Sequence, residues 1–200
     1  MEESAASARY ETSIAPAPMR LSQELGNTIA RTSVPMGSDL LAELDTAQRW
    51  LDDTVAAWCS FHNEPAPSIV LSAADLDQLR ALRTDLRVVL GGASGPAASA
   101  RNRITATATV SVGINSARLS PAGSGVTWLA SAVGLECLLA VEHGELRRLK
   151  LCRSATCGVV FYDRSKNNSR VWHDVGRCGN AANVRAYRAR QSRLLTGSSH

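Results

Sequence analysis

Residues 151–161 read LCRSATCGVVF and residues 172–180 read WHDVGRCGN, and these two stretches decide the fold of the C-terminal part of the chain. Each holds a pair of candidate metal ligands with four residues between them, and fifteen residues separate the two pairs. Zinc in structural sites prefers four cysteine or histidine ligands in a tetrahedral arrangement. The spacing therefore predicts one structural Zn²⁺ ion. Its predicted ligands are Cys152, Cys157, His173 and Cys178.

Two other interpretations of these four residues remain. Cysteines in a reducing compartment often serve only as small buried apolar residues, which is how we interpret Cys59 and Cys137. A catalytic cysteine–histidine pair would need a third group that orients the base, and the sequence singles out no such group. The two matched spacings favour the metal site over both alternatives.

The segment between the two pairs predicts a small hairpin. Residues 158–163 (GVVFYD) and 169–173 (SRVWH) have the composition of strands, and the turn-rich RSKNN connects them. Its core would be small, so metal binding would supply most of the stability of the hairpin.

The positive charge of the chain is concentrated at the C-terminal end. The region from Arg147 to His200 holds twelve lysine or arginine residues and two aspartates, a net charge of +10, whereas residues 1–146 carry −6. A basic segment on an acidic body is typical of proteins that bind a polyanion such as nucleic acid.

Composition favours a cytoplasmic protein. An odd number of cysteines, five, argues against a disulfide framework. The first residues, MEESA, show no charged and then apolar leader. The most apolar run, Val126 to Val141, is shorter than a membrane span and contains Glu136. We therefore expect a cytoplasmic location without a membrane segment, and association with the nucleoid if the protein is bacterial.

Hydrophobic periodicity predicts a mainly helical N-terminal part. Residues 1–18, which end in APAP, predict a flexible arm. Apolar residues then recur at helical spacing, with Asp39 and Ser72 as N-cap residues of the second and third helices, and with Asp75 three residues after Ser72. The predicted helices cover residues 21–32, 39–59 and 72–90.

The pattern changes after residue 92. Ile104–Ile114 alternates β-branched and small residues and predicts a strand, with Ala117–Ser120 as its hairpin partner across Asn115 and Ser116. Residues 126–143 predict a fourth, central helix that Gly144 ends, and residues 145–151 alternate again.

The predicted fold class is thus α+β: a mainly helical N-terminal domain with a small β-hairpin, followed by a C-terminal zinc-ribbon-like hairpin and a basic helix. The predicted boundaries are 1–18 for the arm, 19–145 for a helical regulatory domain, 146–195 for the zinc module with its basic helix, and 196–200 for the tail.

The segment from Leu146 to Arg193 resembles the CGNR zinc-finger family, whose motif ends in Trp-Cys-x4-Cys-Gly-Asn-Arg before a basic helix. In that family the four ligands are cysteines, so the resemblance implies zinc on the same four residues, with histidine in place of cysteine at position 173. Zinc accepts imidazole as readily as thiolate, so this exchange leaves the metal site intact. Ala181 stands where the motif has its final arginine, and whatever contact that arginine makes is lost here.

The upstream part is similar to the ABATE domain, which usually precedes this finger and is described as a stress-induced transcription regulator. The resemblance rests on LSQELGNTIA at residues 21–30 and on the pair Trp50-Leu51. It implies a DNA-binding transcriptional regulator in which the helical domain senses a small molecule or mediates formation of a homodimer.

Residues 180–195 (NAANVRAYRARQSRLL) predict a basic helix directly after the last zinc ligand. Such a helix could enter the major groove of double-stranded DNA and place arginine or asparagine on base edges. One alternative is RNA, with Tyr187, Phe161 or Tyr162 stacking on unpaired bases; another is a solvated basic face, or one paired with the acidic domain. The predicted nucleic-acid-binding residues are Arg164, Lys166, Arg170, Arg177, Asn180, Asn183, Arg185, Arg188 and Arg190.

Residues for a small-molecule effector are harder to select. Asn27 and Arg31 lie beside an apolar helical stripe and could line a cleft, with Trp50 as an apolar wall, although capping and core packing would explain the same residues. His62 and His143 are the only histidines of the helical part, and no nucleophile motif or phosphate loop accompanies them. We therefore expect a binding protein and not an enzyme.

Overall fold

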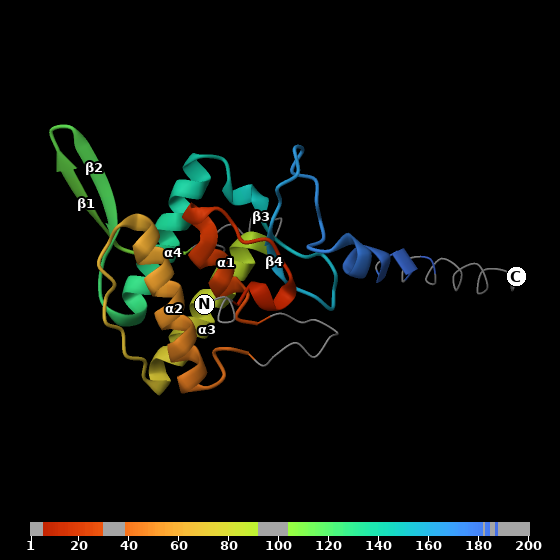
Figure 1. Ribbon diagram of the computed structural model, residues 1–200, viewed down its shortest axis with the longest axis horizontal. Coiled ribbons are helices and arrows are strands. Elements are labelled where there is room, and N and C mark those ends of the chain that lie inside the picture. Colours follow the sequence, from red (N-terminus) through yellow and green to blue (C-terminus); the bar gives the residue numbers. More distant parts are fainter. Residues whose placement is uncertain (1–5, 30–38, 92–103, 182, 185–186, 188–200) are drawn as a thin grey trace, which may run out of the picture.

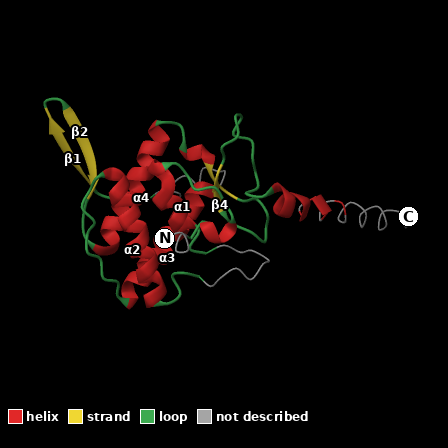
Figure 2. Cartoon of the chain, in the orientation of Figure 1, coloured by secondary structure: helices red, strands yellow, loops and turns green. Residues whose placement is uncertain are grey.

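Within the residues that the structure describes, four α-helices form the body of the protein and a small β-hairpin lies at each end of it (Figure 1; Figure 2). The computed structural model describes residues 6–29, 39–91, 104–181, 183, 184 and 187. The helices are α1 (Arg20–Gly26), α2 (Leu44–His62), α3 (Ala73–Gly91) and α4 (Gly125–Glu142). The antiparallel hairpins pair β1 (Ala108–Gly113) with β2 (Ser116–Pro121), and β3 (Leu149–Leu151) with β4 (Val160–Tyr162). The predicted α+β class is confirmed.

Helix α4 is the central helix of the body, as predicted. By length and composition it could cross a membrane, but 56% of it is buried inside the protein, as in a core helix. Its Glu136 side chain is fully buried and accepts hydrogen bonds from the backbone N–H groups of Leu21 (3.1 Å) and Ser22 (2.7 Å). Burial raises the pKa of Glu136 to about 7, although these hydrogen bonds act in the opposite direction. The carboxyl group therefore fixes the start of α1 against α4.

The helix boundaries differ from the predicted ones where side chains have tertiary partners. Helix α1 ends at Gly26, well before residue 32, and α2 begins at Leu44. Asp39 does not cap α2, whose N-cap residue is Glu43; its carboxylate instead accepts two hydrogen bonds from the Arg83 guanidinium of α3, at 2.5 and 2.9 Å. The start of α3 is as predicted, with the Ser72 N–H and hydroxyl both bonded to Asp75.

The N-terminal segment is packed over its described residues 6–18, unlike the flexible arm that the sequence predicts for residues 1–18. Ala6, Tyr10 and Ala15 are buried. The Gln23 side chain of α1 accepts a hydrogen bond from Ala15 N–H (2.6 Å) and donates one to the Ser13 carbonyl (3.0 Å). A polar side chain of α1 thus holds this segment in place. Hydrophobic periodicity in the sequence cannot predict such hydrogen bonds.

The first hairpin projects from the body at the end opposite the zinc ligands (Figure 1). Gly113 pairs with Ser116, so its turn consists of Ile114 and Asn115, one residue earlier than predicted. At its base the Ser131 hydroxyl of α4 accepts a hydrogen bond from Ala122 N–H (3.0 Å) and donates one to the Thr107 carbonyl.

The second hairpin pairs different residues from those predicted. Residues 158–163 do contain a strand, β4, but its partner is β3 and not residues 169–173, so that prediction of the pairing is wrong. Leu149, Val160 and Tyr162 form a buried cluster with Met19 and Ala140 of the helical body. This burial decides the pairing, and the hairpin packs on the body as part of one structure.

Asn27, directly after α1, links the hairpin to the body through both polar atoms of its side chain. Its side-chain oxygen accepts a hydrogen bond from Val160 N–H and its amide nitrogen donates one to the Val160 carbonyl, both at 2.8 Å. The asparagine thereby takes the place of a neighbouring strand along β4. Gly26 permits the close approach, because a Cβ atom there would lie 2.7 Å from Cγ2 of Val160.

We expect Asn27→Ala to lower the free energy of unfolding by about 2 to 3 kcal/mol, because it leaves the buried Val160 N–H without its acceptor and removes the shorter of two hydrogen bonds to the Val160 carbonyl. Urea unfolding of the zinc-loaded protein measures the change. Gln78→Ala, on the exposed face of α3, is the matched control and should be nearly neutral. Equal stability of the two variants would contradict the role given to Asn27.

Candidate metal centre and basic surface

Cys152, Cys157, His173 and Cys178 come together at one point, with all four ligand atoms within 4.8 Å of one another. His173 Nδ1 lies 3.3 Å from the sulfur of Cys157 and 3.5 Å from that of Cys178. A tetrahedral zinc ion with Zn–S bonds of about 2.3 Å keeps its ligand atoms roughly 3.5 to 4 Å apart. The donor set and its spacing fit one structural zinc ion, with Nδ1 as the histidine ligand.

The first pair of ligands lies in the turn of the β3–β4 hairpin. Cys152 follows β3 and donates its N–H to the Val159 carbonyl (2.8 Å), while Cys157 donates its N–H to the Ser154 carbonyl (3.0 Å). Gly158 has φ of +73°, a conformation that favours glycine. This turn directs Val159 N–H towards the Cys157 sulfur, at 3.5 Å.

The second pair is positioned by a single turn of π-helix, η4 (Val175–Gly179). Asp174 caps this turn, because its carboxylate accepts a hydrogen bond from Arg177 N–H at 2.9 Å. Cys178 in turn donates its N–H to the Asp174 carbonyl at 3.0 Å. The Trp172 ring packs against the cluster of buried ligands and so also helps to position the second pair.

Proximity of the thiols perturbs their acidity. A hydrogen bond from the Cys157 thiol lowers the pKa of Cys152, whereas burial raises the pKa of Cys178. Zinc requires all three sulfurs as thiolates and the imidazole in its neutral form. The four ligands leave no position open for a substrate, so the arrangement is that of a structural site.

Comparison with known proteins agrees with this geometry. Residues 148–191 match the family model of the CGNR zinc finger. That part of the chain is therefore a zinc-finger module in which three cysteines and one histidine hold the metal. No curated protein matches the chain. The family match does not extend to the helical part, whose similarity to the ABATE domain stays a prediction.

A buried carboxylate organises the loop between the two ligand pairs. Asp163 is fully buried and accepts hydrogen bonds from Lys150 Nζ and from the backbone N–H groups of Ser165 and Arg170, all at 2.8 Å. Burial raises the pKa of Asp163, but these hydrogen bonds outweigh it and hold the pKa well below its usual range. Asp163 thus sets the shape of the loop that leads to His173.

Several predicted nucleic-acid-binding residues have contacts inside the protein. Arg170 donates to the His173 carbonyl at 2.5 Å and lies over the Phe161 ring, so it supports the metal site. Arg177 pairs with Glu11 (3.1 Å) and Asp174 (3.6 Å). Arg164 is exposed and donates to the Ile14 carbonyl at 2.7 Å.

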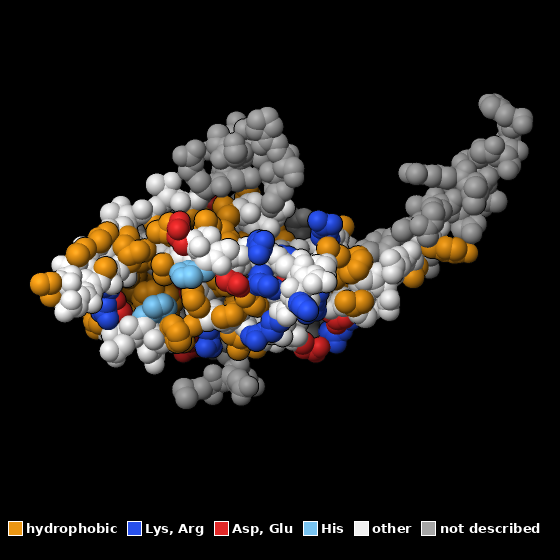
Figure 3. All heavy atoms as spheres, turned by 90° about the horizontal axis from the view of Figure 1, so that it is seen from above, with side chains coloured by type: hydrophobic (Ala, Val, Ile, Leu, Met, Phe, Trp, Pro, Cys, Tyr) orange, Lys and Arg blue, Asp and Glu red, His pale blue; other side chains and the backbone are white. Residues whose placement is uncertain are grey.

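Other basic and polar residues are exposed on the same module. Lys166, Asn180 and Asn183 face solvent, while Arg185, Arg188 and Arg190 lie outside the described residues. Arg147 and Arg153 are exposed as well and flank the first ligand, although the sequence prediction does not include them. Lysine and arginine side chains gather over the part of the molecule that holds the zinc module in Figure 3.

Two of the three predicted base-stacking residues belong to the core. Phe161 is buried in the cluster that surrounds the metal ligands, and the Tyr162 hydroxyl donates a hydrogen bond to Glu145. Neither ring is available to an unpaired base. Tyr187 is exposed and remains a candidate for stacking.

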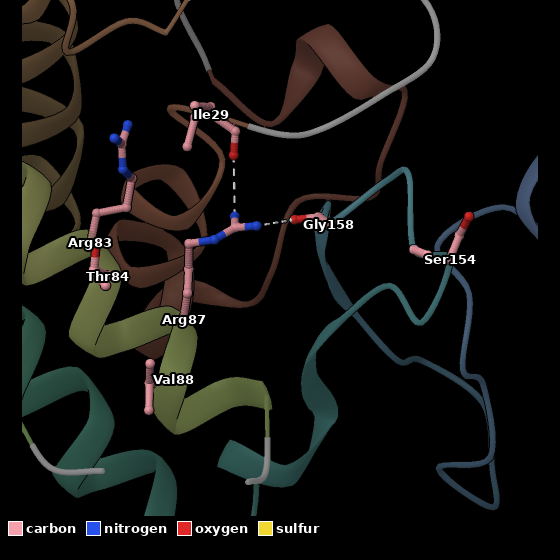
Figure 4. A pocket seen from close by; sticks show the side chains of 8 residues that line it. Ile29, Arg83, Thr84, Arg87, Val88, Ser154 and Gly158 are labelled. Carbon is pink, nitrogen blue, oxygen red and sulfur yellow. Dashed lines mark hydrogen bonds between the residues drawn. The ribbon is translucent and has the colours of Figure 1, made fainter. Parts of the chain in front are cut away.

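Two of the residues predicted to bind an effector, Asn27 and Trp50, do not line the described cavity. Trp50 is buried in the helical core, Asn27 bonds to β4, and Arg31 lies outside the described residues. A cavity of about 420 Å³ is present instead at the junction of α3 with the first zinc turn (Figure 4). Its lining residues include Ile29, Arg83, Thr84, Arg87, Ser154 and Gly158.

Arg87 crosses this junction. Its guanidinium donates to the carbonyls of Gly26 (2.6 Å), Ile29 (3.1 Å) and Gly158 (2.8 Å), and the last two contacts are drawn in Figure 4. Gly158 directly follows the ligand Cys157. One side chain of α3 therefore connects the end of α1 to the metal centre.

Proposed function

We propose that the protein is a DNA-binding transcriptional regulator that acts by binding and not by catalysis. The observation that carries this proposal is the net charge of +10 from Arg147 to His200, on a module whose closed zinc site has a structural role. Exposed Arg147, Arg153, Arg164 and Lys166 belong to the same module. Phosphate neutralisation by such residues supplies most of the affinity of proteins for nucleic acid.

In this proposal the zinc site fixes the start of the basic segment. Asn180 directly follows η4, and the described residues from Asn180 to Tyr187 are helical. A helix whose first turn is held by a metal ligand keeps a defined direction relative to the module, as major-groove recognition requires. Arg185 and Arg188 would then supply phosphate or base contacts.

The helical body would act as the regulatory part. Asn27 and Arg87 connect it to β4 and to the first zinc turn, and the cavity beside Arg87 touches both parts. A small-molecule effector in that cavity would contact the body and the metal module at once. The position of the cavity between the two parts supports the proposal that ligand binding is coupled to the basic surface.

Fluorescence anisotropy with duplex DNA at several salt concentrations tests the proposal. We expect log Kd to rise linearly with log salt, with a slope of about 0.9 for each phosphate contacted. Arg185→Ala with Arg188→Ala should lower both the affinity and this slope. Arg49→Ala, an exposed arginine of α2, is the matched control and should bind like the unaltered protein.

The outcomes separate the candidate functions. A slope near zero, or unchanged affinity of the double variant, would overturn the proposal. RNA binding remains the alternative, and exposed Tyr187 favours it because unpaired bases stack on such rings. Competition of duplex DNA with single-stranded RNA at physiological salt decides between the two, and loss of RNA affinity in Tyr187→Ala would favour RNA.

A further inference from the structure

The N-terminal segment, residues 6–18, contacts the zinc module as well as α1. Tyr10 is buried in the cluster that contains the cysteine ligands. The Ile14 carbonyl accepts a hydrogen bond from Arg164 at 2.7 Å. The chain is thus attached to the module on both sides of Glu11, and these contacts fix where Glu11 lies.

Glu11 directs its carboxylate to the turn that precedes the basic helix. Its backbone has φ of +51°, and its N–H donates to the Ala8 carbonyl at 3.1 Å, so the chain turns tightly at this residue. The carboxylate lies 3.1 Å from Nη2 of Arg177. Arg177 belongs to η4, three residues before Asn180. An acidic side chain of the N-terminal segment therefore lies where the proposed nucleic-acid surface begins.

The contact neutralises Arg177 without burying it. The side chains of Glu11 and Arg177 are 66% and 59% exposed, and exposed ion pairs are weak and screened by salt. Asp174 also lies near this guanidinium, 3.6 Å from Nε. Two carboxylates beside one guanidinium leave an excess of negative charge, which opposes the approach of a phosphate. This argues against a role for Glu11 in orienting Arg177 towards DNA.

We propose that Glu11 is an intramolecular competitor of DNA at Arg177. The inference rests on the proposed function and adds regulation to it, because a phosphate of the bound DNA has to displace the Glu11 carboxylate to reach the guanidinium. Displacement needs only a rotation of the exposed Glu11 side chain, so Tyr10 stays buried and the fold is unchanged. A competitor on the same chain has a fixed effective concentration and lowers the affinity in every encounter.

The helical body sets the position of this competitor. Gln23 of α1 bonds to Ala15 N–H and to the Ser13 carbonyl, and the Asn27 amide donates to the Ser7 hydroxyl at 3.0 Å. The same segment therefore bonds to α1 and carries the carboxylate that faces Arg177. A change in α1 would alter the competition without touching the metal ligands.

Fluorescence anisotropy of the zinc-loaded full chain with duplex DNA, at several salt concentrations, tests the inference. We expect Glu11→Gln, which removes the charge and keeps the shape, to bind about two- to five-fold more tightly at low salt. The slope of log Kd against log salt should rise by about 0.9, the value for one further phosphate contact. Misfolding would weaken binding, so it cannot produce this gain.

Two further variants serve as controls. Glu43→Gln, at an exposed glutamate directly before α2, changes the net charge by the same amount and should leave the slope unchanged. In the Arg177→Ala background, Glu11→Gln should not raise the slope, because the guanidinium that it frees is absent.

The outcomes separate this inference from the proposed function. If the unaltered protein binds DNA and Glu11→Gln binds equally or more weakly, the competition is overturned and the proposed function stands. An equal rise in slope in Glu43→Gln, or in the Arg177→Ala background, would overturn it in the same way. If neither the unaltered protein nor any variant shows salt-dependent binding to DNA, both are overturned.

Discussion

Removal of zinc with a chelator is expected to open both ligand turns and to abolish nucleic-acid binding, while α1 to α4 remain folded. Zinc contributes on the order of 10 kcal/mol to the folding of small zinc modules. The ligand turns have only a small cluster of their own, formed by Cys152, Cys157, Cys178, Val159 and Phe161 with Tyr10 and Trp172. Hydrogen exchange followed by mass spectrometry should show lost protection in residues 150–179 and retained protection in α2 and α4.

Substitutions of the ligand His173 test the zinc assignment most directly. His173→Ala should release zinc, whereas His173→Cys should keep one zinc per chain, because thiolate and imidazole both suit tetrahedral zinc. His143→Ala is the control, since His143 is exposed at the end of α4. Full zinc retention in His173→Ala, measured with a colorimetric indicator, would contradict the assignment of the fourth ligand.

Acidification should have the same effect as chelation. The imidazole must be neutral and the thiols deprotonated to bind zinc, so protons compete with the metal and the affinity for zinc falls as the pH falls. Zinc should thus stay bound at neutral pH and be released progressively in acid. A zinc content independent of pH down to about pH 4, below the usual pKa of histidine, would contradict ligation by His173.

The second large effect that we expect is a loss of stability when the Asp163 carboxylate is removed. Asp163→Ala leaves the backbone N–H groups of Ser165 and Arg170 without their acceptor and Lys150 without its counter-charge, all in a part-buried setting. Breaking a buried pair from one side costs about 3 to 5 kcal/mol. Urea unfolding of the zinc-loaded protein should show a loss of this size.

The control for Asp163 is an exposed aspartate. Asp85→Ala on α3 should change stability by less than about 0.5 kcal/mol. The pH dependence has a definite sign: because the pKa of Asp163 is lowered in the folded state, its contribution is complete above about pH 4 and is lost as the pH falls further. If Asp163→Ala lost no more stability than Asp85→Ala, Asp163 would not organise the loop as described.

The zinc ligands and the long helices could be predicted from sequence because both are local patterns. Four residues between ligands suffice to form a turn around a metal, and the bond between Ser72 and Asp75 that starts α3 also joins neighbours in the chain. The pairing of β4 could not be predicted in this way. Residues 145–151 and 169–173 both alternate, and the choice of β3 depends on a cluster with Met19 and Ala140 that forms only in the folded protein.

Polar contacts across the molecule were the least predictable. Asn27 and Val160 are 133 residues apart, and a polar residue beside an apolar stripe predicts a cleft as readily as a bridge. The same holds for the N-terminal segment, which Gln23 and Arg9 tie to α1 through backbone carbonyls. The partners of such side chains are fixed by three-dimensional proximity, for which sequence spacing gives no signal.

The bridge between Asn27 and Val160 also limits how the protein can be divided. Val160 lies three residues after the ligand Cys157, and its two hydrogen bonds to Asn27 leave little freedom for sliding or rotation. A displacement of α1 is therefore passed to the hairpin that holds Cys152 and Cys157 through the Asn27 side chain and the main chain of Val160. We therefore expect the helical body and the zinc finger to move together, with the body setting the orientation of the finger.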